Sequence, residues 1–396
     1  MNNHLRFALV AFSAAMSLSC WAQQEAVVME LMNPAEAAQV AADYGVTQFE
    51  VAGTSPFARM VAPFPMTGPQ LEAAMAGDLR IKMVEEEAET DYPEDQSSRG
   101  STVAAVFDPN ASYARNTGVW DQIGYTRGRY NIFKTVRVGI VDNGLSIRQR
   151  AIWQKVVASR SFLPDAKGAN DQPMRVDSNG NGLFDEAVGH GTMVTGIVYQ
   201  LAPQARFVIA KVADSDGRAS SWNALRGIVY AVDNQCQLIN FSMGSVHEIV
   251  AFQSLTRWAF DHGSLVVSAA GNEATSHALY PSNYSKVVCV TGLLPDSTKA
   301  PFSCWDDDAD VAAPATGIES AWWTGESAVW SGTSFSAPLV TGVVASALTN
   351  ANTPTPQTLL NKIAQSGDNI NAQNPLYTNQ LGRGLNSAKL IWSLSH

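Results

Sequence analysis

The chain has 396 residues, of which 46% are hydrophobic and 16% charged, so it can bury a large core and is not disordered as a whole. Its formal net charge is -10, but residues 1–99 hold 5 Lys+Arg against 14 Asp+Glu, whereas residues 100–396 hold 21 against 22. Neither part has the concentrated basic stretch that nucleic-acid binding needs, so we expect no nucleic-acid partner.

The first residues have the layout of a secretory signal peptide. Arg6 precedes a mostly apolar stretch over 7–18, and small residues lead to Ala22, after which we expect cleavage, giving a signal peptide over 1–22. No apolar run reaches the length that spans a bilayer, so we expect no membrane partner. Cys20 also allows a bacterial lipoprotein, although Ser17 stands where that signal prefers a larger aliphatic residue. The sequence thus predicts a secreted or periplasmic protein, with lipid anchoring as the less favoured alternative.

A small α+β module with an acidic linker is predicted over 23–100. Strands are expected at 27–32 and 80–84 and helices at 34–44 and 70–76, with further strands between the helices. Seven acidic residues follow within 85–95. Because such a run repels itself in compact packing, we interpret it as a solvated linker.

The sequence over 101–396, which we expect to form the second domain, has the pattern of an α/β fold. Short β-branched strands alternate with helices, which indicates a mainly parallel sheet with helices on both faces. The strands are expected at 136–141, 207–212, 238–242, 265–269 and 287–291, and the clearest helices at 221–234, 247–262 and 334–349. Ligands of such sheets bind beyond the carboxyl ends of the strands.

Three polar side chains lie near the ends of these elements, close to glycine. Asp142 ends the first of the strands, His190 stands in Gly-His-Gly-Thr, and Ser334 stands in Ser-Gly-Thr-Ser. A serine hydroxyl needs an imidazole to take its proton, and the imidazole needs a carboxylate to orient it. Taken singly, each residue has an ordinary structural explanation: a carboxylate at a strand end, a packed histidine, and a serine at a helix start.

Together, the three segments resemble the Asp, His and Ser boxes of the subtilisin-like serine peptidases, in that family's chain order, over about 118–394. The resemblance implies Asp142 as the orienting acid, His190 as the general base and Ser334 as the nucleophile of a serine endopeptidase that forms an acyl-enzyme. Residues 269–273 resemble the family's oxyanion loop, with Asn272 as the amide donor. The chain departs from the family at Asn143, where Ser, Thr or Asp is usual.

Substrate contacts and processing are also implied by this resemblance. The expected partners are protein or peptide substrates, which would contact Ser242, Met243, Gly244, Ala270, Gly271 and Leu279. Leu279 either makes the primary pocket apolar and shallow, favouring small or medium apolar residues before the scissile bond, or only packs. The module at 23–100 resembles in outline the family's pro-domain, a ferredoxin-like α+β folding aid and intramolecular inhibitor, and 101–396 is then expected to be the peptidase domain. We therefore expect a monomeric, self-processed zymogen, cut between Glu89 and Arg115.

One loop and the cysteines leave alternatives open. Within 177–186, oxygen-bearing side chains alternate around a glycine as in calcium loops, and a structural calcium competes with a plain surface turn. The candidate ligands are Asp177, Asn179, Asn181 and Asp185, although Val188 replaces the expected bidentate Glu. The chemistry itself requires no cofactor. In an oxidising compartment a disulfide is compatible with the cysteines, and Cys289 and Cys304 are the pair closest in sequence.

Two other functions compete with the endopeptidase. The first is a binding or self-processing protein on the same fold, whose site cuts only its own leader and then stays occluded. The second is a carboxyl-type peptidase with an acidic base, which the presence of both His190 and Asn272 disfavours.

Overall fold

The structure is a computed structural model, and it describes residues 25–90, 102–126, 135–164, 168–348 and 354–395. The predicted signal peptide and Cys20 lie outside the described residues. Within the described part, no helix is both long enough and apolar enough to cross a membrane.

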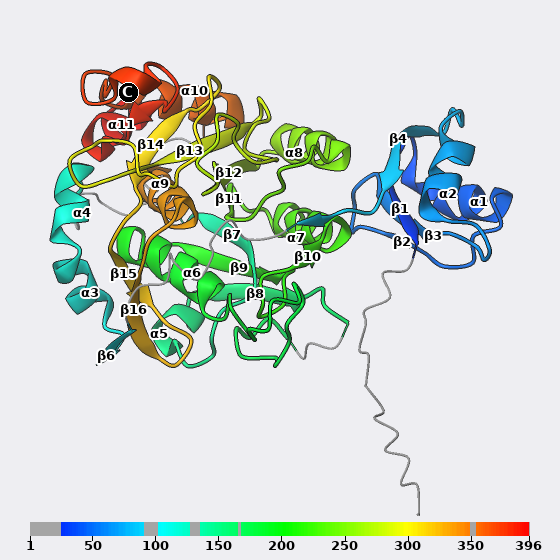
Figure 1. The fold of residues 1–396 in the computed structure, drawn as a ribbon, viewed down its shortest axis with the longest axis horizontal. Coiled ribbons are helices and arrows are strands. Elements are labelled where there is room, and N and C mark those ends of the chain that lie inside the picture. The colour runs from blue at the N-terminus through cyan, green and yellow to red at the C-terminus, as the bar shows by residue number, and fades with distance from the viewer. Residues whose placement is uncertain (1–24, 91–101, 127–134, 165–167, 349–353, 396) are drawn as a thin grey trace, which may run out of the picture.

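An eight-stranded sheet with parallel pairing throughout forms the centre of the larger part of the molecule (Figure 1). The five predicted strands are its middle strands, and each reads as an apolar run because both faces are covered. Three strands were not predicted, and two of these are edge strands that lack such a run. The order is β17 (Arg383–Gly384), β14 (Val311–Pro314), β13 (Val287–Leu293), β12 (Leu265–Ala269), β11 (Leu238–Phe241), β7 (Arg137–Asp142), β9 (Arg206–Lys211), β8 (Val156–Ser161).

Helices cover both faces of this sheet and bury separate cores. α6 (His190–Leu201) and α9 (Thr333–Leu348) pack together on one face, and every residue of α9 is buried. α7 (Ser221–Asp233) and α8 (Val250–Asp261) cover the other face. The helices predicted at 221–234, 247–262 and 334–349 are confirmed as α7, α8 and α9. Two further helices, α10 (Pro356–Ser366) and α11 (Ser387–Ser395), follow near the C-terminus.

A three-stranded antiparallel sheet lies beside α6. Its hairpin, β15 (Ile318–Ala321) and β16 (Glu326–Trp330), leads directly into α9, and β6 (Thr102–Val106) pairs with β16. The segment after β6 forms α3 (Pro109–Arg115) and α4 (Thr117–Gln122), and α5 (Arg150–Trp153) follows β7. The hairpin therefore packs against α3 on one side and leads along the chain into α9.

The N-terminal module, residues 25–90, has its own core and a βαββαβ order. The antiparallel order β2-β3-β1-β4 is that of a ferredoxin-like fold, as expected. Thr67 and Gln70 form a capping box that starts the second helix. Its elements are β1 (Ala26–Leu31), η1 (Pro34–Glu36), α1 (Ala37–Asp43), β2 (Phe49–Val51), β3 (Phe57–Val61), α2 (Gly68–Met75) and β4 (Ile81–Glu86).

The interpretation of the acidic run as solvated linker is wrong for its first part. The Glu85 side chain reaches the first turn of α8. There its carboxylate accepts hydrogen bonds from Val250 N at 2.9 Å and Ala251 N at 2.7 Å. Glu87 pairs with Arg59 at 2.6 Å. A helix N-terminus and arginines thus offset the repulsion that the sequence argument relied on. Residues 91–95 of the run lie outside the described residues.

The disulfide between Cys289 and Cys304, which the sequence left open, is not formed. Both residues are buried free thiols, as is Cys236. The Cys304 thiol instead donates to a Glu273 carboxylate oxygen at 3.2 Å. Burial raises the pKa of all three thiols, which keeps them protonated and unreactive.

Candidate active site

The predicted acid and base are in direct contact at the carboxyl edge of the sheet. Asp142 is the last residue of β7 and His190 the first residue of α6. His190 Nδ1 lies 3.0 Å and 3.1 Å from the two Asp142 carboxylate oxygens, and both side chains are 1% exposed. Since a carboxylate only accepts, Nδ1 carries the proton, and Nε2 is the nitrogen suited to act as a base.

The glycines on either side of His190 are required by close packing. Gly189 has φ +94°, and a Cβ there would lie 2.3 Å from the Trp322 ring. A Cβ at Gly191 would lie 2.3 Å from the Gly144 carbonyl oxygen and 2.8 Å from Asp142 Oδ1. The Gly-His-Gly sequence therefore lets the start of α6 approach the end of β7 closely enough for the acid–base contact.

Asn143, the departure from the family pattern, clamps the start of α6. Its side-chain oxygen accepts from Gly191 N at 2.9 Å, and its amide nitrogen donates to the Ala187 carbonyl at 2.6 Å. Its own backbone N–H donates to Asp142 Oδ1 at 2.8 Å. Asn143 thus connects the residues before and after His190 to the end of β7.

Two buried groups of opposite charge, Asp171 and Lys211, support the same region. The Asp171 carboxylate accepts from Gly189 N at 2.9 Å and from Thr192 Oγ1 at 2.6 Å. The Lys211 ammonium donates to the Asn143 carbonyl at 2.5 Å. Burial raises the pKa of Asp171 to about 6 and lowers that of Lys211, while each charge favours the other.

Sequence reasoning missed these supporting roles. Asp171 lies in a loop without a recognisable motif, and Asn143 was noted only as a departure from the family. One signal existed at Lys211, a lysine at the end of the otherwise apolar run of β9. A buried lysine requires a partner, so that position pointed to a nearby carboxylate.

Ser334 stands in the first turn of α9, at the same edge of the sheet. Its hydroxyl donates to the Ser242 carbonyl at 3.0 Å, and the Ser242 hydroxyl donates back to the Ser334 carbonyl at 2.9 Å. The ring of Phe335, the next residue, has its centroid 5.4 Å from that of His190. The start of α9 thus packs against the histidine ring, and Ser242 links it to the end of β11.

Asn272 is fixed by the residue before Ser334. Its side-chain oxygen accepts from Thr333 N and from Thr333 Oγ1, both at 2.9 Å. The amide is therefore oriented with its oxygen on α9 and its NH₂ group as the donor end. That is the orientation an oxyanion donor needs. Thr333, which holds this orientation, was quoted in the motif without a role.

The predicted substrate-contacting residues come together around Leu279. A Cβ at Gly271 would lie 2.6 Å from Leu279 Cγ, and a Cβ at Gly244 would lie 2.9 Å from Leu279 Cβ. Leu279 N donates to the Ala270 carbonyl at 2.8 Å, and the leucine side chain is nearly buried. Met243, which precedes Gly244 in the chain, is fully buried. Their contact with substrate stays a prediction.

A two-stranded sheet between the N-terminal module and the larger part of the molecule was not predicted. β5 (Glu89–Thr90), at the end of the N-terminal module, pairs antiparallel with β10 (Ala219–Ser220), which precedes α7. The register places Thr90 opposite Ala219 and Glu89 opposite Ser220. Two residues are too few for an alternating pattern, so sequence periodicity could not reveal either strand.

The proposed calcium loop closes on itself by hydrogen bonds. The two Asp177 carboxylate oxygens accept from Asn181 N at 3.0 Å and Gly182 N at 2.9 Å. Asp185 Oδ1 accepts from backbone N–H groups of 174–176, and the Asn179 and Asn181 amides both donate to Glu186. No group of three or more His, Cys, Asp or Glu residues in the described ranges is arranged to hold a metal ion. Calcium binding by this loop stays a prediction, beside the alternative of a plain surface turn.

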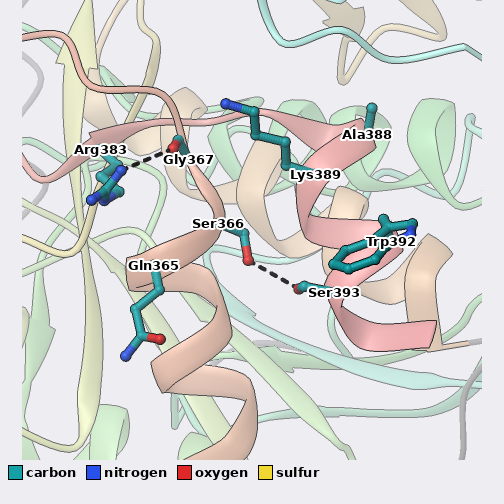
Figure 2. Close-up of a pocket in the computed structure, with 8 residues that line it drawn as sticks. All are labelled: Gln365, Ser366, Gly367, Arg383, Ala388, Lys389, Trp392 and Ser393. Atoms are coloured by element: carbon teal, nitrogen blue, oxygen red, sulfur yellow. Dashed lines mark hydrogen bonds between the residues drawn. The ribbon is translucent and has the colours of Figure 1, made fainter. Parts of the chain in front are cut away.

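A hollow of about 520 Å³ opens between α10 and α11 (Figure 2). The Ser366 and Ser393 hydroxyls are hydrogen-bonded at 2.9 Å across it, and the Arg383 guanidinium donates to the Gly367 carbonyl. None of the predicted site residues lines it. The lining residues are Gln365, Ser366, Gly367, Arg383, Ala388, Lys389, Trp392 and Ser393.

The larger part of the chain matches a known protein family. The model of the subtilase family matches residues 134–384, which is more than half of the chain. The chain belongs to the subtilase family. Being a subtilase, it is a serine endopeptidase, and its expected substrates are proteins.

Named relatives and solved structures are similar over much of the chain. Thermitase of Thermoactinomyces vulgaris is 32% identical over 52% of this chain and 72% of its own length. The thermophilic serine proteinase of Bacillus sp. (strain AK1) is 27% identical over 61% of this chain and 60% of its own. The solved structure of fervidolysin from Fervidobacterium pennivorans, a keratinolytic enzyme related to subtilisin, matches with a TM-score of 0.72 and 19% identity. The match covers 93% of this chain and 61% of the fervidolysin chain. At that identity, the last likeness shows the fold alone.

Proposed function

We propose that the chain cleaves proteins through an acyl-enzyme formed on Ser334, with His190 as the base and Asp142 as the group that orients it. The observation that carries the proposal is the buried contact between His190 Nδ1 and the Asp142 carboxylate, at the edge where α9 presents Ser334. All these side chains come from one chain, which is consistent with a monomer.

In this mechanism the Ser334 hydroxyl loses its proton to His190 Nε2 as its oxygen attacks the scissile carbonyl. Asp142 stabilises the imidazolium that forms, without itself becoming protonated. The Asn272 amide and the Ser334 backbone N–H would then donate to the oxyanion. In sites of this type, one such side-chain donor contributes roughly 3 to 4 kcal/mol to the transition state. His190 finally returns the proton to the leaving amine, and water releases the acyl group.

We further propose that the enzyme is exported as a zymogen and that the N-terminal module is its pro-domain. The signal-peptide layout of residues 1–22 supports export. The ferredoxin-like module supports the zymogen, because it lies against α7 and α8 and its last described strand pairs with β10. The same pairing favours one alternative, in which the site cuts only its own leader and stays occluded.

Treatment of the purified protein with a fluorophosphonate probe, beside the Ser334→Ala variant, tests the proposal. We expect the parent chain, and not the variant, to be labelled, and the parent to degrade an unfolded protein. Labelling without turnover of any added protein would support the self-processing alternative. Absence of labelling in a processed chain would overturn the assignment of Ser334.

A further inference from the structure

Beside the strand edge formed by β10 lies the cationic side chain of Arg218, which faces the paired strand β5. Arg218 directly precedes β10, and its guanidinium pairs with the Glu89 carboxylate on β5. The acidic side chain thus comes from the strand that pairs with this edge, and the cation comes from the edge itself.

Arg218 is held in place independently of Glu89. Its guanidinium donates to the Ser178 carbonyl at 2.5 Å, and its backbone N–H donates to Asp214 Oδ1 at 3.1 Å. Asp214 Oδ1 also accepts from the backbone N–H groups of Asp216 and Gly217, which fixes the turn before β10. A guanidinium held in this way is positioned to bind a carboxylate whichever strand supplies it.

The position of this edge relates it to extended substrates. β9 ends at Lys211, which is the register partner of Asp142 in β7, so the segment that leads to β10 leaves the sheet at the edge that holds the acid and base. Extended peptides can bind by adding a strand to an exposed sheet edge, where main-chain bonds give affinity and side-chain contacts give specificity.

We infer that Arg218 is a specificity determinant that selects an acidic side chain upstream of the scissile bond in extended protein substrates. This inference rests on the proposed endopeptidase function and adds a substrate class to it. In it, β5 of the leader occupies the edge as a substrate strand would, and Glu89 marks the side chain that Arg218 prefers. Both side chains are partly exposed, at 35% for Arg218 and 43% for Glu89, so the preference is modest.

Mass spectrometry of a digested peptide pool tests this specificity. The purified, processed protein is incubated with the pool, and residue frequencies are counted at each position before the cleaved bonds. We expect Asp and Glu to be enriched about two- to fivefold at one upstream position, which is the range that an exposed ion pair gives. Arg218→Gln should lose the enrichment, and Arg218→Glu should replace it by enrichment of Lys and Arg.

The matched control is Arg257→Glu, which makes the same charge change at an exposed position of α8 and should keep the acidic preference. Cleavage without acidic enrichment, or with the same enrichment in the two Arg218 variants, overturns the inference and leaves the endopeptidase intact. A wild-type chain that cleaves no peptide overturns the proposed function and the inference with it.

Self-processing gives a second readout that needs no added substrate. Glu89→Lys should slow the release of the leader from the full chain by about two- to fivefold, and pairing it with Arg218→Glu should restore the rate. Failure of the charge exchange to restore processing would contradict a direct contact between the two side chains.

Discussion

Asn143 differs from the residues usual in the family at this position, and its side chain holds the segment around His190 in place. Two bonds from its amide span His190, reaching Ala187 on one side and Gly191 on the other. The Asp142 carboxylate accepts a hydrogen bond from Asn143 N. The departure that sequence comparison flags is therefore a support for the histidine and not a defect at the aspartate.

Replacing that amide should reduce catalysis. Asn143→Ala removes both bonds, and because a net hydrogen bond contributes about 1 kcal/mol, we expect kcat/KM to fall roughly tenfold or more. Asn181→Ala, on the exposed loop, is the control and should leave kcat/KM unchanged. Steady-state kinetics on an unfolded protein substrate measures both. An unaltered kcat/KM in Asn143→Ala would show that the clamp does not position His190.

Asp310 gives a pH dependence of stability with a definite sign. Burial raises its pKa from 3.8 to about 7, and its carboxylate accepts from Cys289 N. Between these two pKa values the native chain holds a proton that the unfolded chain has released. The contribution of Asp310 to the free energy of unfolding therefore falls as pH rises from about 4 to 7.

The variant Asp310→Asn should remove this loss, because the amide stays neutral and its oxygen can still accept from Cys289 N. We expect its Tm to exceed that of the parent by about 2 to 5 °C at pH 8 and to match it near pH 4. Asp307→Asn, at an exposed neighbouring position, is the control for the loss of one charge. Calorimetry at the two pH values makes the comparison, and an equal shift at both would contradict the assignment.

At the scale of elements, the approach of α6 to β7 places the base against the acid. A methyl group at Gly191 would meet the Gly144 carbonyl at 2.3 Å, so Gly191→Ala must push α6 and β7 apart. We expect kcat to fall roughly 100-fold while the fold is kept, since displacements near 1 Å have that effect. Gly118→Ala, in α4, is the matched control because no atom lies within 4 Å of the added Cβ. Retained activity in Gly191→Ala would show that this contact is not needed.

The loop over 177–186 has a simple thermal test. Its side-chain oxygens are already held by backbone N–H groups, so we expect a chelator to change Tm by less than about 1 °C. A larger drop that calcium reverses, and that Asp177→Asn abolishes, would establish the calcium site that the sequence leaves open as an alternative to a surface turn. Differential scanning calorimetry with and without chelator distinguishes the two outcomes.

At the scale of the whole molecule, the sequence predicts the parts whose signals are local. Central strands such as β11 and β13 are apolar runs because both faces of the sheet are covered, and helices α7 to α9 follow them at the expected places. The proposed catalytic residues could be singled out because each stands in a motif at the end of an element. Contacts between distant segments are not predicted in this way.

Three features that the sequence analysis misread, missed or left open have that common cause. From the sequence, the Glu85 carboxylate is expected to be solvated, but in the folded chain it binds the first turn of α8, which lies 165 residues later. The pairing of β5 with β10 joins two short strands that have no pattern of their own. Cys289 and Cys304 are near in sequence, but the Cys304 thiol is engaged by Glu273 in the folded chain. Each depends on a tertiary contact that no window of sequence contains.

In the proposed mechanism Ser334 and His190 act as one unit. Kinetics of Ser334→Ala, His190→Ala and the double variant test this most directly. Each single change should reduce kcat for protein cleavage by roughly 10⁴- to 10⁶-fold, and the double variant should be no slower than the worse single variant. The residual rate would come from binding and the oxyanion donors. If the two losses multiply in the double variant, or if either single variant keeps its activity, the two side chains do not form the proposed catalytic pair.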